Sequence, residues 1–179
     1  MKTLMNAAQI DAAIGQLYNS IVSELTPETN IAIIGIRSRG EILANRLTKK
    51  LEQYRKAKIP CGTLDITLYR DDLNAPRAGV QPVVRATEIE FDVNDKCILL
   101  VDDVLHTGRS VRAAMDALTD LGRPRTVRLA VLVDRGDREL PIRADYVGFR
   151  AEVGPDEVVK VHLAEHDQVD QVIVEQADA

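Results

Sequence analysis

The chain has 179 residues, of which 45% are hydrophobic and 28% charged, a balance typical of one globular domain with a buried core. Its formal net charge of −5 excludes a protein that binds nucleic acid through overall positive charge. The apolar runs are too short to cross a bilayer, the N-terminal stretch is polar, and Cys61 and Cys97 form no metal-binding pattern, so we expect a reducing, cytoplasmic setting.

The first half of the chain predicts two amphipathic helices and two strands. Residues 6–25 begin with Asn6 and Gln9, which are typical of a capping box. The stripe expected to be buried in this helix is Ile10, Ala13, Ile14, Leu17, Ile21 and Leu25. Residues 30–36 predict a buried strand, and residues 40–54 a helix whose inner face holds Leu43, Leu47, Leu51 and Tyr54. Residues 63–69 alternate as a strand does, with Leu64, Ile66 and Leu68 on one side.

The second half continues the alternation of strands and helices. Strands are expected at residues 96–101, 126–133 and 158–163, and a helix at 110–121 that ends before Gly122 and Pro124. The stripe expected on that helix is Val111, Ala114, Met115, Leu118 and Leu121. The pattern predicts an α/β fold whose mostly parallel central sheet has helices on both faces.

Polar sequences follow four of the expected strands. They are residues 37–40, residues 70–72, residues 102–110 and residues 134–136. Parallel sheets bind ligands at the carboxyl ends of their strands, so these four segments predict one site at one edge of the sheet.

The segment VDDVLHTGRS, residues 101–110, contains two kinds of binding chemistry. Thr107 to Ser110 open a helix, where free amides and the helix dipole bind phosphate, and Gly108 lets the backbone approach closely. Asp102 and Asp103 are repelled by that phosphate, so they are expected to hold sugar hydroxyls or Mg²⁺. A ribose 5-phosphate satisfies both halves, and the alternative is a capped loop with solvated acids.

This segment resembles the signature of type I phosphoribosyltransferases, which bind phosphoribosyl pyrophosphate (PRPP). Three longer stretches, residues 65–73, 111–124 and 129–148, resemble the pyrimidine operon attenuator PyrR family, whose members are also uracil phosphoribosyltransferases. The resemblance implies a type I phosphoribosyltransferase fold with a small hood, formed as one domain over residues 1–179. It further implies a hood built from the chain ends and about 140–165, and a homo-oligomer, a dimer or larger.

The resemblance also implies a reaction and its site. Uracil and PRPP would give UMP and pyrophosphate, with Mg²⁺ accompanying PRPP. Catalysis is expected from Asp102, Asp103 and Arg39. The substrate-binding residues would be Arg37, Ser38, Arg39, Gly40, Asp102, Asp103, Val104, Leu105, His106, Thr107, Gly108, Arg109, Ser110, Arg135 and Val159. Arg37 to Gly40 would hold pyrophosphate, and residues 70–86, with Arg77 and Arg85, would form a flap over PRPP.

Two of these positions keep an alternative. His106 is expected to act as a spacer in the loop rather than as a catalytic residue. Val159 would face uracil beside Arg135, but on the sequence alone core packing explains its position in a strand better. The signature alone also fits a purine or orotate phosphoribosyltransferase.

The family resemblance implies regulation as well, through binding of a pyrimidine mRNA leader switched by UMP or UTP. Arg138 and Arg143 are candidate phosphate contacts, and Arg150 a third. No cation occurs between Thr3 and Ile36, so the first helix adds none. Three contacts predict weak RNA binding with a salt slope of roughly −2 to −3, and the alternative function is a salvage enzyme whose RNA binding is weakened or lost.

Overall fold

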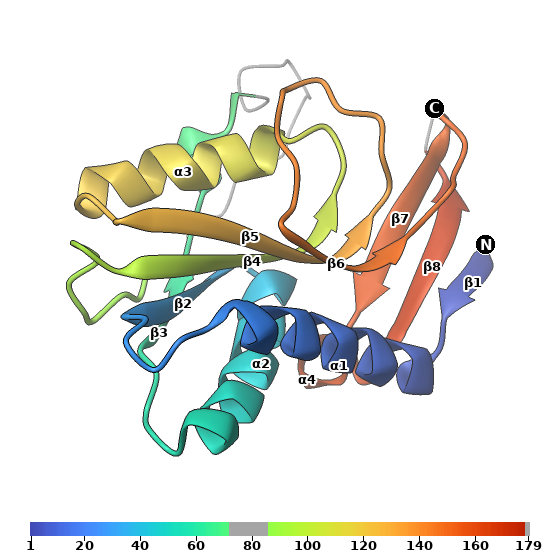
Figure 1. The fold of residues 1–179 in the computed structure, drawn as a ribbon. Helices are drawn as coiled ribbons and strands as arrows, with labels where there is room; N and C mark the ends of the chain where they lie inside the picture. Colours follow the sequence, from blue (N-terminus) through green and yellow to red (C-terminus); the bar gives the residue numbers. More distant parts are fainter. Residues whose placement is uncertain (72–85, 178–179) are drawn as a thin grey trace.

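The structure is a computed structural model that describes residues 1–71 and 86–177. Five parallel strands form the central sheet in the order β3-β2-β4-β5-β6, and three antiparallel strands form a smaller sheet, β1-β8-β7 (Figure 1). The central strands are β2 (Ile31–Ile36), β3 (Cys61–Leu64), β4 (Cys97–Leu105), β5 (Thr126–Asp134) and β6 (Tyr146–Arg150). The smaller sheet contains β1 (Lys2–Met5), β7 (Glu157–His162) and β8 (Gln171–Gln176).

Helices cover both faces of the central sheet. Helices α1 (Ala7–Glu24) and α2 (Arg39–Arg55) lie on one face and α3 (Arg109–Leu121) on the other (Figure 1). Alternate residues of β4 point to opposite faces, so Leu99 packs in the core under α1 and α2, whereas Ile98 and Leu100 pack under α3. The predicted three-layer α/β fold is therefore confirmed. Within the described residues, no helix is long and apolar enough to span a membrane.

Helix α1 begins as its sequence predicts. The Asn6 side chain accepts a hydrogen bond of 3.0 Å from the Gln9 amide, and the Gln9 side chain accepts one of 2.9 Å from the Asn6 amide. This capping box satisfies two amide donors that a helix start would otherwise leave unpaired.

Several predicted apolar faces differ from those observed. Tyr54 and Leu68 were expected to be buried but are 52% and 75% exposed. Leu68 is exposed because the chain after β3 forms a short 3₁₀ helix, η1 (Thr67–Tyr69), instead of continuing as a strand. The Asp65 carboxylate causes this turn by accepting hydrogen bonds from the amide and hydroxyl of Thr67. Met115 and Leu121 of α3 are also largely exposed, because the smaller Ala113 and Ala117 make the contact with the sheet.

Four strands were absent from the sequence prediction or assigned differently. β6 was not predicted, and it forms the edge of the central sheet although residues 146–150 fall inside the segment assigned to the hood. Strands β1 and β8 come from the two chain ends, where short runs gave no strand signal. β7 was expected as a fifth central strand but pairs with β8 in the smaller sheet.

Two glycines allow the start of α2 to lie against the sheet. A Cβ atom on Gly35 would lie 2.4 Å from the Glu41 Cα, and one on Gly40 would lie 2.5 Å from the Val101 carbonyl oxygen. Both positions face backbone atoms, so a side chain could be accommodated only by moving α2 away from β2 and β4. Glycine at these positions therefore sets the spacing between residues 37–40 and the end of β4.

We predict that Gly35→Ala destabilises the fold by about 3 kcal/mol or more, because overpacking against backbone cannot be relieved by a change of rotamer. Gly15→Ala is the matched control, since Gly15 lies within α1 and a Cβ atom there would meet nothing within 4 Å. The control should be stabilised by about 0.5–1 kcal/mol. Urea unfolding of both variants measures this, and equal effects would contradict the spacing argument.

Candidate functional site

Residues from three strand ends meet at the carboxyl edge of the central sheet. Residues 37–40 follow β2, Asp102 and Asp103 lie in the last part of β4, and Arg135 follows β5. A methyl group on Gly40 would lie only 3.2 Å from the Asp102 Cα, which places the arginine-containing loop directly beside the acids. The structure therefore brings together three of the four segments that the sequence predicted to share one site, residues 37–40, 102–110 and 134–136.

The two acids are less exposed than expected. The sequence placed both acids after a strand predicted at residues 96–101, but β4 continues to Leu105. Asp102 is only 6% exposed and Asp103 is half-buried. The Asp103 amide donates to the Asp102 carboxylate at 2.9 Å, and the Val104 amide donates to the Asp103 carboxylate at 2.8 Å. The acids are thus held inside the strand end by the backbone that follows them.

Burial gives Asp102 unusual acid–base behaviour. Desolvation, and then the nearby charge of Asp103, raise the pKa of Asp102 well above its ordinary 3.8, although the Asp103 amide partly opposes the shift. A ligand that donates hydroxyl groups or brings a divalent cation would favour the ionised form. Such a ligand would therefore lower the pKa of Asp102 again.

The turn before α3 has the geometry of an anion site. Gly108 is the residue before the helix and adopts a φ of 92°, which favours glycine. The Thr107 carbonyl accepts hydrogen bonds from the amides of Glu139 and Leu140, so a loop from beyond β5 fixes the turn. Amides in the first turn of a helix have no partner within the helix and can bind phosphate.

Arg109 and the remaining turn residues lie on the outer side of this site. The Arg109 guanidinium forms 2.6 Å ion pairs with Asp71 and Glu139 and is 45% exposed, whereas Ser110 is half-buried in the first turn of α3. Leu105 is buried in the core under α3, so its predicted contribution can come only from its backbone. Arg77 and Arg85 lie outside the described residues.

The loop after β2 presents two arginines in different settings. Arg37 lies 3.4 Å from the carboxylates of Glu41 and Glu88. Arg39 instead forms a two-point contact with Asp167 at the end of α4 (Ala164–Asp167), with nitrogen–oxygen distances of 2.6 and 3.2 Å. The Arg37–Ser38 peptide bond is cis. Because α2 begins at Arg39, both arginines lie at or just before the start of this helix, where an anion would also meet the helix dipole.

Arg135 links the central sheet to the smaller one. Its side chain is buried and donates to the backbone carbonyls of Glu157 and Gly154, at and before the start of β7. Val159 lies two residues further along β7, and its side chain packs in the core. Core packing thus explains the Val159 side chain, and only its backbone is available to a ligand.

The surroundings of His106 favour its neutral form. Partial burial, and next the positive charge of Arg135, lower the pKa of His106 below its ordinary 6.5. A neutral imidazole near neutral pH agrees with its expected role as a spacer and adds no positive charge to the site.

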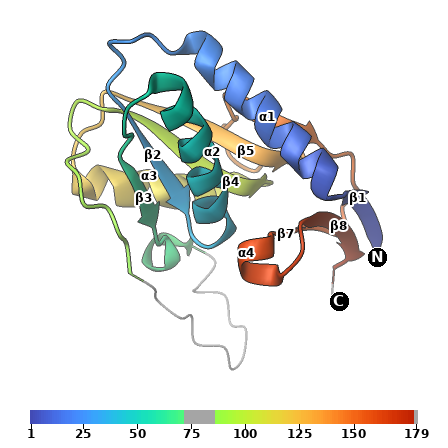
Figure 2. The same ribbon diagram turned by 90° about the horizontal axis from the view of Figure 1, so that it is seen from below.

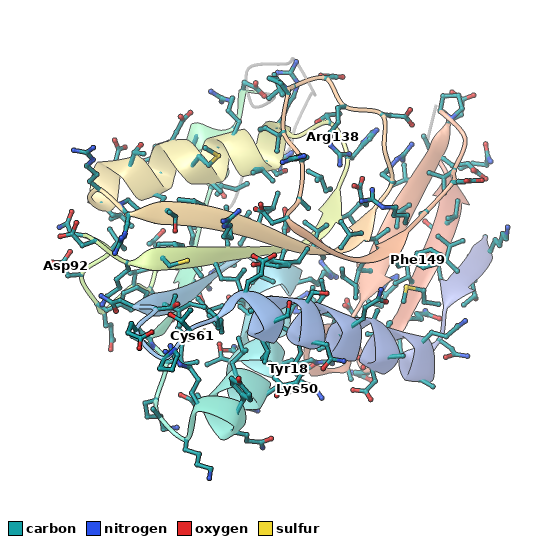
Figure 3. All side chains as sticks on the ribbon, viewed as in Figure 1. Tyr18, Lys50, Cys61, Asp92, Arg138 and Phe149 are labelled. Carbon is teal, nitrogen blue, oxygen red and sulfur yellow. The ribbon has the colours of Figure 1, made fainter. Side chains whose placement is uncertain are left out.

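Arg138 has a structural role that the sequence did not indicate. It lies in the loop after β5 (Figure 3). Its guanidinium donates to the carbonyls of Ile142, His106 and Gly136 and forms a 2.7 Å ion pair with buried Asp134. These contacts hold the loop after β5, so Arg138 has few donors left for RNA. Arg143, the other predicted RNA contact, is exposed.

The sequence analysis missed the residues that attach α4 to α2. Arg46 of α2 binds both Glu165 and Asp170, and Arg39 binds Asp167. The available signal was the three acids among residues 165–170, which have no Lys or Arg near them in the sequence after Lys160.

Comparisons with known proteins agree with this geometry. Residues 2–168 match the family model described as phosphoribosyl transferase domain. The chain is 51% identical to the Bifunctional protein PyrR of Deinococcus radiodurans, over 95% of this chain and 92% of the relative. It is 48% identical to the Bifunctional protein PyrR of Clostridioides difficile, over 97% of both chains. A hypoxanthine-guanine phosphoribosyltransferase structure from Bacillus anthracis covers 99% of this chain and 98% of its own, with a TM-score of 0.71 at 16% identity, and shows the same fold. The chain therefore belongs to the phosphoribosyl transferase domain family and, within it, to the family of the bifunctional protein PyrR.

Proposed function

We propose that this protein transfers the phosphoribosyl group of PRPP to uracil, giving UMP and pyrophosphate. The observation that carries the proposal is the adjacency of three features: the buried acid pair of β4, the glycine turn that opens α3, and the arginine loop packed against Asp102 through Gly40. Together they match the sugar, the 5-phosphate and the pyrophosphate of PRPP.

Each part of the substrate has a chemically suitable partner. The 5-phosphate would accept hydrogen bonds from the amides of Thr107 to Ser110, as anions do at helix N-termini. The ribose hydroxyls would donate to the carboxylate oxygens of Asp102 and Asp103. In the described part of the chain, no group of three or more side chains could hold a metal ion by itself. Magnesium still fits this arrangement, because it commonly binds through one or two carboxylates together with substrate phosphates.

The arginine loop would stabilise the departing pyrophosphate. As the bond between C1 of the ribose and the pyrophosphate oxygen breaks, negative charge grows on the leaving group. Arg37 and Arg39 would stabilise that charge by charge-assisted hydrogen bonds. Bound magnesium would supply further positive charge to the pyrophosphate oxygens.

The acids contribute to the other half of the charge separation. The ribose becomes cation-like when the leaving group departs, and carboxylates fixed beside it stabilise that charge. Asp102 lies in a buried position where such an electrostatic effect is strong. The raised pKa of free Asp102 implies that hydroxyl donors and magnesium must favour its ionised form on binding.

Uracil would lie between the end of β5 and β7. Its ring edge presents an acceptor, a donor and an acceptor, which backbone N–H and C=O groups of the segment near Val159 can match without any side chain. Arg135 holds the start of β7 near this position through the carbonyls of Glu157 and Gly154.

Regulation through RNA is a second proposed function, supported by the resemblance to the PyrR family. The structure reduces its predicted basis, because Arg138 braces its own loop. Arg143 is exposed, and the side chain of Arg150 is 75% exposed although it pairs with Asp134. Phe149 lies exposed on the edge strand β6 and adds no charge (Figure 3).

The activity is tested by a panel of nucleobases with PRPP. We expect UMP formation from uracil, no comparable product from hypoxanthine, guanine or orotate, and complete loss of turnover when EDTA removes divalent cations. Product chromatography measures all four reactions. Preferential turnover of a purine or of orotate would replace uracil as the substrate, and turnover unaffected by EDTA would contradict the magnesium assignment.

A second prediction separates stability from catalysis at Asp102. Since its folded pKa is raised, the contribution of this carboxyl to stability is fully present below its ordinary 3.8 and is lost as the pH rises through the folded value. Asp102→Asn should therefore be more stable than the wild type at about pH 8 but not at about pH 4. Its kcat/KM should fall by about 10²–10³.

Urea unfolding across this pH range and steady-state kinetics provide both measurements. Asp103→Asn is the matched control, because it removes the same charge from a more exposed position. The control should lose activity with a smaller gain in stability. Wild-type kinetics in both variants would contradict the ribose assignment.

RNA binding should be weak and only slightly dependent on salt. With two exposed arginines available instead of three, the expected slope of log K against log salt is roughly −1.4 to −1.8. Filter binding to the protein's own pyrimidine leader, with and without UMP, measures it over a salt series. Tight binding that UMP enhances, with a steep slope, would show that other residues form the RNA surface.

A further inference from the structure

Two arginine–carboxylate links join α2 to the segment around α4, and they are built alike. Asp167 accepts two hydrogen bonds from Arg39 and one from the Leu163 amide. Asp170 accepts two from Arg46 and one from the Ala164 amide. Figure 2 shows α4 beside the N-terminal part of α2. The links differ in two respects: Arg46 also binds Glu165, and only Arg39 belongs to the loop proposed to bind pyrophosphate.

Asp167 is well placed to fix the Arg39 side chain. One carboxylate oxygen lies 2.6 Å from Arg39 Nη2, and the other lies 3.2 Å from Nε and 2.9 Å from the Leu163 amide nitrogen. The Asp167 side chain is 12% exposed. Its two oxygens therefore hold one edge of the guanidinium in a defined plane and leave Nη1 outside this contact.

The charge of Asp167 is maintained over the pH range of an assay. Burial alone would raise its pKa, but hydrogen bonds from Arg39 and the Leu163 amide, with the charges of Arg39 and His162, lower it to about 2. Asp167 is thus ionised at neutral pH, where its carboxylate can hold Arg39.

We propose that Asp167 is a positioning residue for the pyrophosphate site, acting through Arg39. The proposal rests on the proposed function. A free arginine side chain samples many rotamers, and part of its binding free energy is lost when a ligand must order it. The fixed carboxylate orders the guanidinium beforehand, as outer carboxylates orient histidine ligands at metal sites.

The same carboxylate connects two parts of the site. Leu163 directly follows β7, the strand proposed to face uracil, and its amide binds the oxygen of Asp167 that also contacts Arg39. The arginine loop and the residue after β7 therefore share one side chain as a hydrogen-bond acceptor, and an asparagine oxygen could keep the contact with the Leu163 amide.

The test measures binding of inorganic pyrophosphate with magnesium, and separately of UMP, by titration calorimetry. Asp167→Asn keeps the size of the side chain but places an NH₂ group or a single acceptor opposite a guanidinium that needs two acceptors. We expect its pyrophosphate affinity, and the KM for PRPP, to worsen about tenfold, by analogy with the loss of an orienting carboxylate. UMP affinity should stay within about twofold, because UMP has no group for Arg39 to bind.

A double-mutant cycle shows whether Asp167 acts through Arg39. In an Arg39→Ala background, Asp167→Asn should cause no further loss of pyrophosphate affinity. Asp170→Asn and Arg46→Ala are the matched controls, since they disturb the parallel link between the same two elements. Both controls should bind pyrophosphate as the wild type does, even where thermal unfolding shows that they are less stable.

Three outcomes would overturn the proposal. Tighter pyrophosphate binding in Asp167→Asn would mean that the carboxylate competes with the ligand for Arg39. Equal losses in Asp167→Asn and Asp170→Asn, or additive losses with Arg39→Ala, would mean a general structural role. Failure of the proposed function is distinguishable, because the wild type itself would then neither bind pyrophosphate nor form UMP.

Discussion

The contact between the start of α2 and the end of β4 determines the geometry of the whole site. Gly35 and Gly40 have no side chains, so the backbone of the arginine loop can lie against Val101 and Asp102. In the proposed reaction, the cation-like ribose would lie beside the acids of β4 and the anionic leaving group beside the arginines of the loop after β2. A wider spacing would preserve every functional residue and still separate the two halves of the reaction.

The acid pair of β4, Asp102 and Asp103, suits ligand binding but lowers the stability of the free protein. Asp102 is buried beside a second carboxylate, which raises its pKa and makes its ionised form unfavourable in the free protein. A buried charge without a cation partner is normally selected against, unless a ligand supplies the missing positive charge or hydroxyl donors. The position is therefore better explained by a bound substrate than by folding, which agrees with the assignment of β4 to the ribose.

The sequence predicted the elements whose pattern is local and failed where a distant partner decides. The capping box at Asn6, the buried strand over residues 31–36 and the glycine turn at Gly108 each depend on neighbouring residues, and all were found. Leu68 was misassigned because an Asx turn at Asp65 ends the strand. Distant partners, more than 25 residues away in the sequence, bind the side chains of Arg138, Arg46 and Asp167. No periodicity in the sequence indicates such pairs.

The contacts of the arginines between Arg109 and Arg150 explain why this segment uses arginine rather than lysine. This segment has nine arginines and no lysine. Arg135 and Arg138 each bind several acceptors with a planar fork that a lysine ammonium cannot reproduce, and Arg109 bridges Asp71 to Glu139. Arginine therefore suits the bracing of these loops, and its pairing with carboxylates weakens the attraction that Arg109 and Arg138 could exert on RNA.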